Sequence, residues 1–148
     1  MKKPSFLTSL RNEGKLELVE PSEEICASYL EKAESSRKSA DVLLPHKLYE
    51  NSVSSSYYAM YNALTALLYK TGIKCENHSA AIILLRNLLG QEELYKSISK
   101  AKEERIDRQY YVSSKKTEEE TKESAEKMLK DAERFITEIK YPALKGGV

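Results

Sequence analysis

A long segment without charge in the middle of the chain constrains the fold more than any other feature. From Ser52 to Tyr69 the sequence contains no charged residue. Apolar and small residues recur there at helical spacing on two faces, with Tyr57, Tyr61, Leu64 and Leu68 on one and Ala59, Ala63 and Ala66 on the other. A helix that is apolar on all sides has to be surrounded by other elements. We therefore predict a central helix from Leu48 to about Lys70, ended by Gly72.

The segment before it predicts a first long helix that packs on this centre. Pro21 to Glu24 open this helix with acidic residues in the first turn, where they interact favourably with the helix dipole. Pro45 ends it, because proline cannot continue a helix. The stripe expected to face inward contains Ile25, Tyr29, Ala33, Ser36, Ala40, Leu43 and Leu44.

Three more helices are predicted after the centre. A short one follows the N-cap Asn77 and ends at Gly90, and a longer one begins near Gln91 and weakens around residues 110–112. The last begins at Thr117, which forms a capping-box pattern with Glu120. Its stripe is the most regular in the chain: Ala125, Met128, Leu129, Ala132, Phe135, Ile136 and Ile139.

Together these segments predict an all-α protein, an up-and-down bundle of four main helices plus one short helix. The bundle is expected to occupy residues 21–141 as a single domain, which suits a chain of 148 residues. Residues 1–20 are expected to be an irregular segment packing on the body, although Ser5 to Leu10 could form a helical turn. Residues 142–148 are expected to be a flexible tail.

Composition excludes several classes of protein. The net charge of +1 excludes a chain that is basic throughout, but it allows a local basic patch. No run approaches the ~18 apolar residues of a membrane span, and the start of the chain lacks the apolar core of a signal peptide. A cytoplasmic protein is therefore expected. Cys26 and Cys75 share no metal-binding spacing, so free thiols, no metal and no cofactor are expected.

Tyrosines are the first candidates for a functional surface. The chain has ten tyrosines and no tryptophan, and Tyr57, Tyr58 and Tyr61 lie within about one helical turn. They could fill the core with their hydroxyls at its rim. They could also form a stacking surface for nucleobases.

Arg105 is the second candidate. It lies four residues beyond the inward stripe of Leu94, Ile98 and Ala101. A guanidinium on an apolar face needs a partner, which could be an internal carboxylate or a bound phosphate. The candidate contacts to RNA or a nucleotide are therefore Arg105, Arg108, Tyr110, Tyr111, Tyr57 and Tyr58.

The two histidines offer little catalytic machinery. His78 falls in the first turn of the short helix, where the positive helix end disfavours its protonation. A neutral, hydrogen-bonded structural imidazole is one interpretation, and a role in a site at the end of the bundle is the other. His46 follows Pro45 in a connection and is expected to be exposed.

Taken together, these residues resemble the HEPN domain family, in particular its small stand-alone archaeal and bacterial members. The resemblance extends over roughly residues 22–140 and rests on the order and spacing of several pieces. They are Ser56 to Ala63, Ala66 to Leu68, Gly72 with Ile73, His78, Arg105, Tyr110 and the final amphipathic helix.

The resemblance implies a helical bundle that often dimerises. Many members look like ribonuclease toxins or RNA-binding modules encoded beside a minimal nucleotidyltransferase that acts as the antitoxin. Their nuclease motif is an arginine, a polar residue and, a little further on, a histidine. Arg105 matches the arginine, but Tyr110 or Tyr111 stands at the histidine position, and no histidine follows His78. Tyrosine, with a pKa of about 10, is a poor substitute for a general acid or base that titrates near neutrality.

Three hypotheses follow. The first is a HEPN-like homodimer with little or no catalysis that binds RNA, a nucleotide or a nucleotidyltransferase partner near Arg105. The second is a metal-independent ribonuclease toxin in which Arg105 and His78 are the catalytic candidates. The third is a purely structural dimerisation module, with the small residues of the central helix as the seam between subunits.

Overall fold

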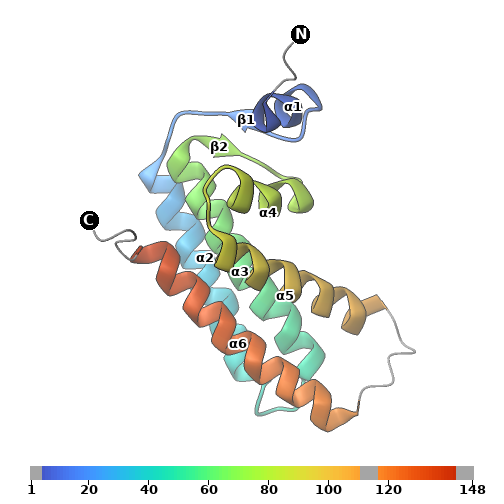
Figure 1. Ribbon diagram of the computed structural model, residues 1–148. Helices are drawn as coiled ribbons and strands as arrows, with labels where there is room; N and C mark the ends of the chain where they lie inside the picture. The colour runs from blue at the N-terminus through green and yellow to red at the C-terminus, as the bar shows by residue number, and fades with distance from the viewer. Residues whose placement is uncertain (1–4, 111–116, 143–148) are drawn as a thin grey trace, which may run out of the picture.

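The structure is a computed structural model that describes residues 5–110 and 117–142, without the side chains of residues 108–110. These residues form six helices and a two-stranded sheet, α1 (Phe6–Asn12), β1 (Glu17–Leu18), α2 (Glu23–Leu43), α3 (Tyr49–Thr71), β2 (Ile73–Lys74), α4 (His78–Asn87), α5 (Glu92–Tyr110) and α6 (Glu118–Lys140) (Figure 1). The prediction of a mainly helical protein is confirmed. None of the described helices is long and apolar enough to cross a membrane.

Helix α3 is the centre of the fold, as its uncharged sequence predicts. It packs against α2, α5 and α6 (Figure 1). The helix ends at Gly72, which has a φ of 89° and donates its N–H toward the carbonyls of Leu68 and Tyr69. The predicted stop at Gly72 is therefore confirmed.

The small residues of α3 do not form a seam between subunits. Ala59, Ala63 and Ala66 are all 0% exposed within a single chain. Small side chains allow the neighbouring helices of the same chain to approach closely, and that approach covers this face completely. The prediction that this face forms the dimer seam is therefore wrong.

Helix α2 buries a narrower stripe than predicted. Its N-cap is Ser22, whose hydroxyl accepts a hydrogen bond from the Ile25 N–H at 3.0 Å. Ile25 itself is 40% exposed, and the buried positions are Cys26, Ala33 and Ala40. Placing Ile25 on the inward stripe was wrong, because the contact line follows these small residues, which let α2 lie close to α3. Ser52 of α3 even donates to the Ala40 carbonyl, at 2.9 Å.

The N-terminal segment contains more regular structure than expected. Helix α1 and strand β1 lie within it, and β1 pairs in antiparallel fashion with β2, immediately after α3. Leu10 and Leu16 are both buried in the hydrophobic core. A segment of this length becomes ordered because it buries apolar side chains and satisfies its backbone against the main body.

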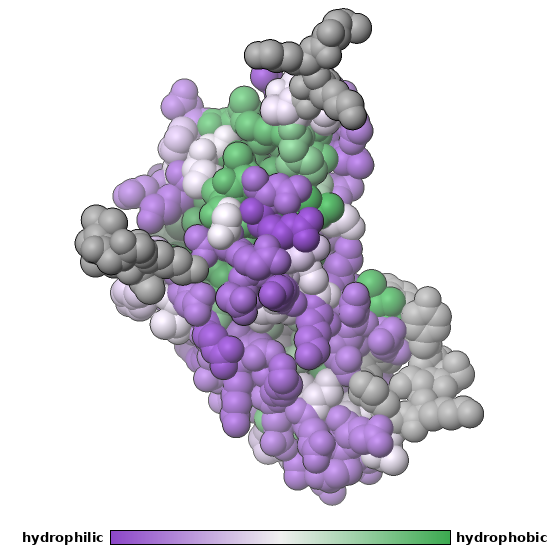
Figure 2. Space-filling view, viewed as in Figure 1, coloured by the Kyte–Doolittle hydropathy of each residue, from purple (hydrophilic) through white to green (hydrophobic). Residues whose placement is uncertain are grey.

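The remaining helices begin at the predicted caps. The Asn77 side chain accepts a hydrogen bond from the Ala80 N–H at 2.9 Å, and the Thr117 hydroxyl accepts one from the Glu120 N–H at 3.1 Å. All seven residues of the predicted α6 stripe are buried. The outer faces of α5 and α6 are largely hydrophilic in Figure 2, as amphipathic helices require.

Candidate functional site

Five side chains from three helices meet where α3, α4 and α5 come together. Helix α3 contributes Tyr57, Tyr58 and Tyr61, α4 contributes its first residue, His78, and α5 contributes Arg105. We refer to these five residues as the aromatic cluster. The central helix therefore supplies both the core of the fold and the base of the candidate site.

The imidazole of His78 is held by two tyrosines. Its Nδ1 lies 2.8 Å from the hydroxyl of Tyr57, which is 0% exposed. The Tyr61 ring stacks on the imidazole with centroids 3.7 Å apart and an interplanar angle of 13°. These contacts fix both the position and the plane of the ring.

The hydroxyls of Tyr57 and Tyr61 stay protonated. Burial, reinforced by the neighbouring Tyr61, raises the pKa of Tyr57 well above its usual range despite the opposing charge of Arg105. Burial likewise raises the pKa of Tyr61 to about 12. A protonated Tyr57 hydroxyl satisfies its own donor by pointing at Nδ1, which assigns the proton of neutral His78 to Nε2. His78 then offers an N–H donor and no free basic nitrogen.

The charge state of His78 follows from its surroundings. Burial, together with the positive charges of Lys102 and Arg105, lowers the pKa of the imidazole below its usual value of 6.5. The ring is therefore neutral at neutral pH. This agrees with the expectation of a neutral, hydrogen-bonded imidazole at the start of the short helix.

Arg105 completes the cluster on the side of α5. Leu94, Ile98 and Ala101 are buried as predicted, and the next position of that stripe brings the guanidinium over two tyrosine rings. Its central carbon lies 5.4 Å from the Tyr57 ring centroid and 5.1 Å from that of Tyr58. Both distances are within the range of a cation–π interaction.

Arg105 also has unused hydrogen-bonding capacity. Its Nε is buried and has no hydrogen-bond partner among the described residues. Among the residues that the structure describes, no carboxylate lies within ion-pair distance of it. The internal salt bridge that the sequence left open as one explanation for Arg105 is thus not seen in this part of the chain.

Three other candidates cannot be placed. The side chains of Arg108 and Tyr110, in the last turn of α5, and the whole of Tyr111 lie outside the described residues. Their assignment as RNA or nucleotide contacts therefore stays a prediction.

The sequence did not predict that Lys102 belongs to this region, whereas Tyr61 is one of the three tyrosines that it offered as a stacking surface. Lys102 lies three residues before Arg105 and donates from Nζ to the Ser79 hydroxyl at 2.7 Å. The spacing of three residues, which places Lys102 on the same helix face as Arg105, could have predicted this.

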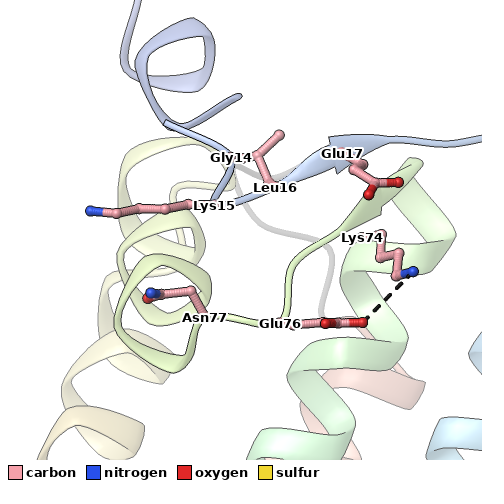
Figure 3. A pocket seen from close by; sticks show the side chains of 7 residues that line it. All are labelled: Gly14, Lys15, Leu16, Glu17, Lys74, Glu76 and Asn77. Atoms are coloured by element: carbon pink, nitrogen blue, oxygen red, sulfur yellow. Dashed lines mark ion pairs between the residues drawn. The ribbon is translucent and has the colours of Figure 1, made fainter. Parts of the chain in front are cut away.

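A hollow separate from the aromatic cluster lies between the segment that contains β1 and the connection from β2 to α4 (Figure 3). It has a volume of about 170 Å³ and is lined by Gly14, Lys15, Leu16, Glu17, Lys74, Glu76 and Asn77. Lys74 lies 3.7 Å from Glu76, an ion pair drawn in Figure 3, and Lys15 lies 3.2 Å from Glu13. Because both cations have acidic partners, this hollow is a weaker candidate for an anion than the aromatic cluster.

The chemistry of the cluster favours binding. It combines neutral aromatic rings, a fixed N–H donor and a cation without an acidic partner among the described residues. These groups suit a ligand with a phosphate and a planar base. In the described part of the chain, no three His, Cys, Asp or Glu side chains are grouped so that they could hold a metal ion.

Comparison with known proteins shows a family and a relative to which the chain is similar. The HEPN domain family matches residues 27–141 of the chain. A protein of Methanocaldococcus jannaschii with the name "Putative toxin MJ0605" is 32% identical over 115 residues, which cover 75% of this chain and 83% of that protein. The family match includes every residue of the aromatic cluster.

Proposed function

Because the chain belongs to the HEPN domain family, we propose that it is a HEPN module of toxin–antitoxin type that binds RNA or a nucleotide through the aromatic cluster. The name of the Methanocaldococcus jannaschii relative supports the toxin–antitoxin setting. The arrangement of Arg105 and the tyrosines supports the binding role.

The proposal extends to the finer features that the family resemblance implies. These are an up-and-down bundle with α2, α3, α5 and α6 as its main helices, a homodimer, and a minimal nucleotidyltransferase as partner. The protein is proposed to act in the cytoplasm.

One observation carries the binding role. The Arg105 guanidinium lies over the Tyr57 and Tyr58 rings without an acidic partner among the described residues, and a phosphate bound at this group would compensate its charge. Beside it, the Tyr58 ring is 39% exposed and can take a stacked base. Phosphate and base could therefore be bound side by side.

Arg105→Ala tests this role. We expect its affinity for a labelled single-stranded RNA, measured by fluorescence anisotropy, to fall about tenfold or more, because a charge-assisted hydrogen bond is lost. The matched control is Arg86→Ala. Arg86 also lies over a tyrosine, with its guanidinium carbon 4.3 Å from the Tyr95 ring centroid, but its Nε donates to the Asn87 side chain at 3.1 Å.

The control should bind RNA like the wild type. If Arg105→Ala binds RNA unchanged and loses only thermal stability, Arg105 is a structural residue and the binding role is wrong. A loss of affinity that is equal in both variants would also count against a specific site.

The ribonuclease hypothesis keeps one observation in its favour, since His78 and Arg105 do lie in the same cluster. The assignment of the proton to Nε2 and the lowered pKa of His78 oppose it, because this imidazole is neither a free base nor a ready acid at neutral pH. Purified protein should therefore leave RNA intact. Cleavage by the wild type that His78→Ala abolishes would reverse this conclusion.

A further inference from the structure

Lys102 gives the aromatic cluster a second cation. It precedes Arg105 by three residues on α5, so the two side chains share one face of the helix. Its Nζ is held toward the start of α4 by the bond of 2.7 Å to the Ser79 hydroxyl, next to His78. Ser79 is a neutral partner, so the charge of Lys102 is not compensated by this contact.

Two carboxylates close in sequence to the aromatic cluster have partners of their own. Glu104 accepts a hydrogen bond of 2.6 Å from Ser124 on α6, and Glu76 lies 3.7 Å from Lys74. Within the described residues neither Lys102 nor Arg105 has an acidic partner in an ion pair. Both cations act on His78, whose pKa they help to lower.

We propose that Lys102 and Arg105 bind two adjacent phosphate groups of one ligand, with Ser79 assisting Lys102. This inference rests on the proposed function, since it uses the same site. Lys102 and Arg105 are about 4.5 Å apart along the axis of α5 and lie on one face of it, so both long side chains can reach phosphates of the same ligand. The positive end of α4 adds a potential of the same sign.

Two sources carry this chemistry, a step of single-stranded RNA and the diphosphate of a nucleotide. In both, one phosphate would accept hydrogen bonds from Arg105 and the other from Lys102. Ser79 would then change from acceptor to donor by rotating its hydroxyl toward the phosphate. The base beside the first phosphate would lie against Tyr58.

Lys102→Gln tests the paired site, and Lys100→Gln is its control. Lys100 is an exposed lysine on the same helix, two residues earlier and therefore on a different face, so both variants lose one charge from α5. Calorimetric titration with ADP and AMP should show that the wild type and Lys100→Gln bind ADP about threefold to tenfold more tightly than AMP. Lys102→Gln should bind both nucleotides equally, whereas Lys102→Arg should keep the preference.

The second arm uses a single-stranded oligouridylate RNA over a series of salt concentrations. Lys102→Gln should weaken binding and reduce the slope of log affinity against log salt by about 0.7, the contribution of one phosphate contact. Lys100→Gln should keep the slope of the wild type. An effect in the RNA arm alone identifies RNA as the source of the phosphates, and an effect in the ADP arm alone identifies a nucleotide.

Failure of this inference can be told apart from failure of the proposed function. If Arg105→Ala loses binding while Lys102→Gln behaves like Lys100→Gln in both arms, the paired site is wrong and the binding role stands. If neither Arg105→Ala nor Lys102→Gln alters any affinity, both proposals fail. Thermal melting of each variant shows whether the fold is retained.

Discussion

At the scale of residues, one hydrogen bond determines what His78 can do. The Tyr57 hydroxyl lies 2.8 Å from Nδ1 and comes from a different helix, 21 residues earlier in the sequence. The position of Arg105 could be predicted, because it continues the period of Leu94, Ile98 and Ala101. The Tyr57–His78 pair could not, because no periodicity links residues on separate helices, and only the packing of α4 on α3 brings them together.

His78 should make stability depend on pH. Its pKa is lowered in the folded state by burial, Lys102 and Arg105. Below about pH 6.5 the unfolded chain therefore binds more protons at His78 than the folded protein does. The contribution of His78 to the free energy of unfolding should therefore be constant above that pH. It should decrease as the pH falls toward the lowered pKa of the folded state.

Thermal melting between pH 7.5 and pH 5 measures this effect. His78→Asn, which does not titrate in this range, should show a smaller decrease in Tm than the wild type. His46→Asn is the control and should follow the wild type, and any contribution from carboxylates is common to all three proteins. Parallel curves for the wild type and His78→Asn would show that His78 is not the responsible group.

At the scale of elements, helix ends were the most predictable features. A helix begins or ends where a single residue favours it, so these positions can be predicted from the local sequence. The examples are the N-caps Asn77 and Thr117 and the stops Gly72 and Pro45. The inward face of α2 was less predictable, since the choice between Ile25 and Cys26 depends on how closely α3 approaches. The pairing of β1 with β2 joins segments far apart in the sequence, so it could not be predicted from a local pattern.

Among these helix ends, Gly72 should be the position where a substitution destabilises the protein most. It has a φ of 89°, and a Cβ built there would lie 2.8 Å from the Val19 carbonyl oxygen. The Val19 N–H in turn donates to the Gly72 carbonyl at 2.9 Å, which joins the N-terminal segment to the end of α3. Gly72→Ala therefore combines an unfavourable backbone conformation with a close contact to backbone.

Gly90→Ala isolates the first of these two effects. Gly90 has a φ of 64°, and a Cβ there would meet nothing within 4 Å. Denaturant unfolding should show a loss of about 1 kcal/mol for Gly90→Ala, and a loss at least about 1 kcal/mol larger for Gly72→Ala. Equal losses would mean that the chain near Val19 moves aside without cost.

At the scale of the whole molecule, α3 connects the stability of the fold to the proposed site. Its uncharged sequence makes it the buried centre, and the same helix presents Tyr57, Tyr58 and Tyr61 toward α4 and α5. The helical class and the family could be predicted, because both depend on patterns along the chain. The lack of an acidic partner for Arg105 among the described residues could not be predicted, because it depends on which side chains three helices bring together.

The central claim is that ligand binds at the aromatic cluster, and the two histidines allow a direct test. NMR spectra of the imidazole protons of His46 and His78 should be recorded during addition of single-stranded RNA or ADP. His46 lies in the connection between α2 and α3, and His78 lies within the cluster. We predict that the His78 resonances shift in a saturable manner while those of His46 stay in place. Saturable binding that leaves the His78 resonances unchanged would contradict the account.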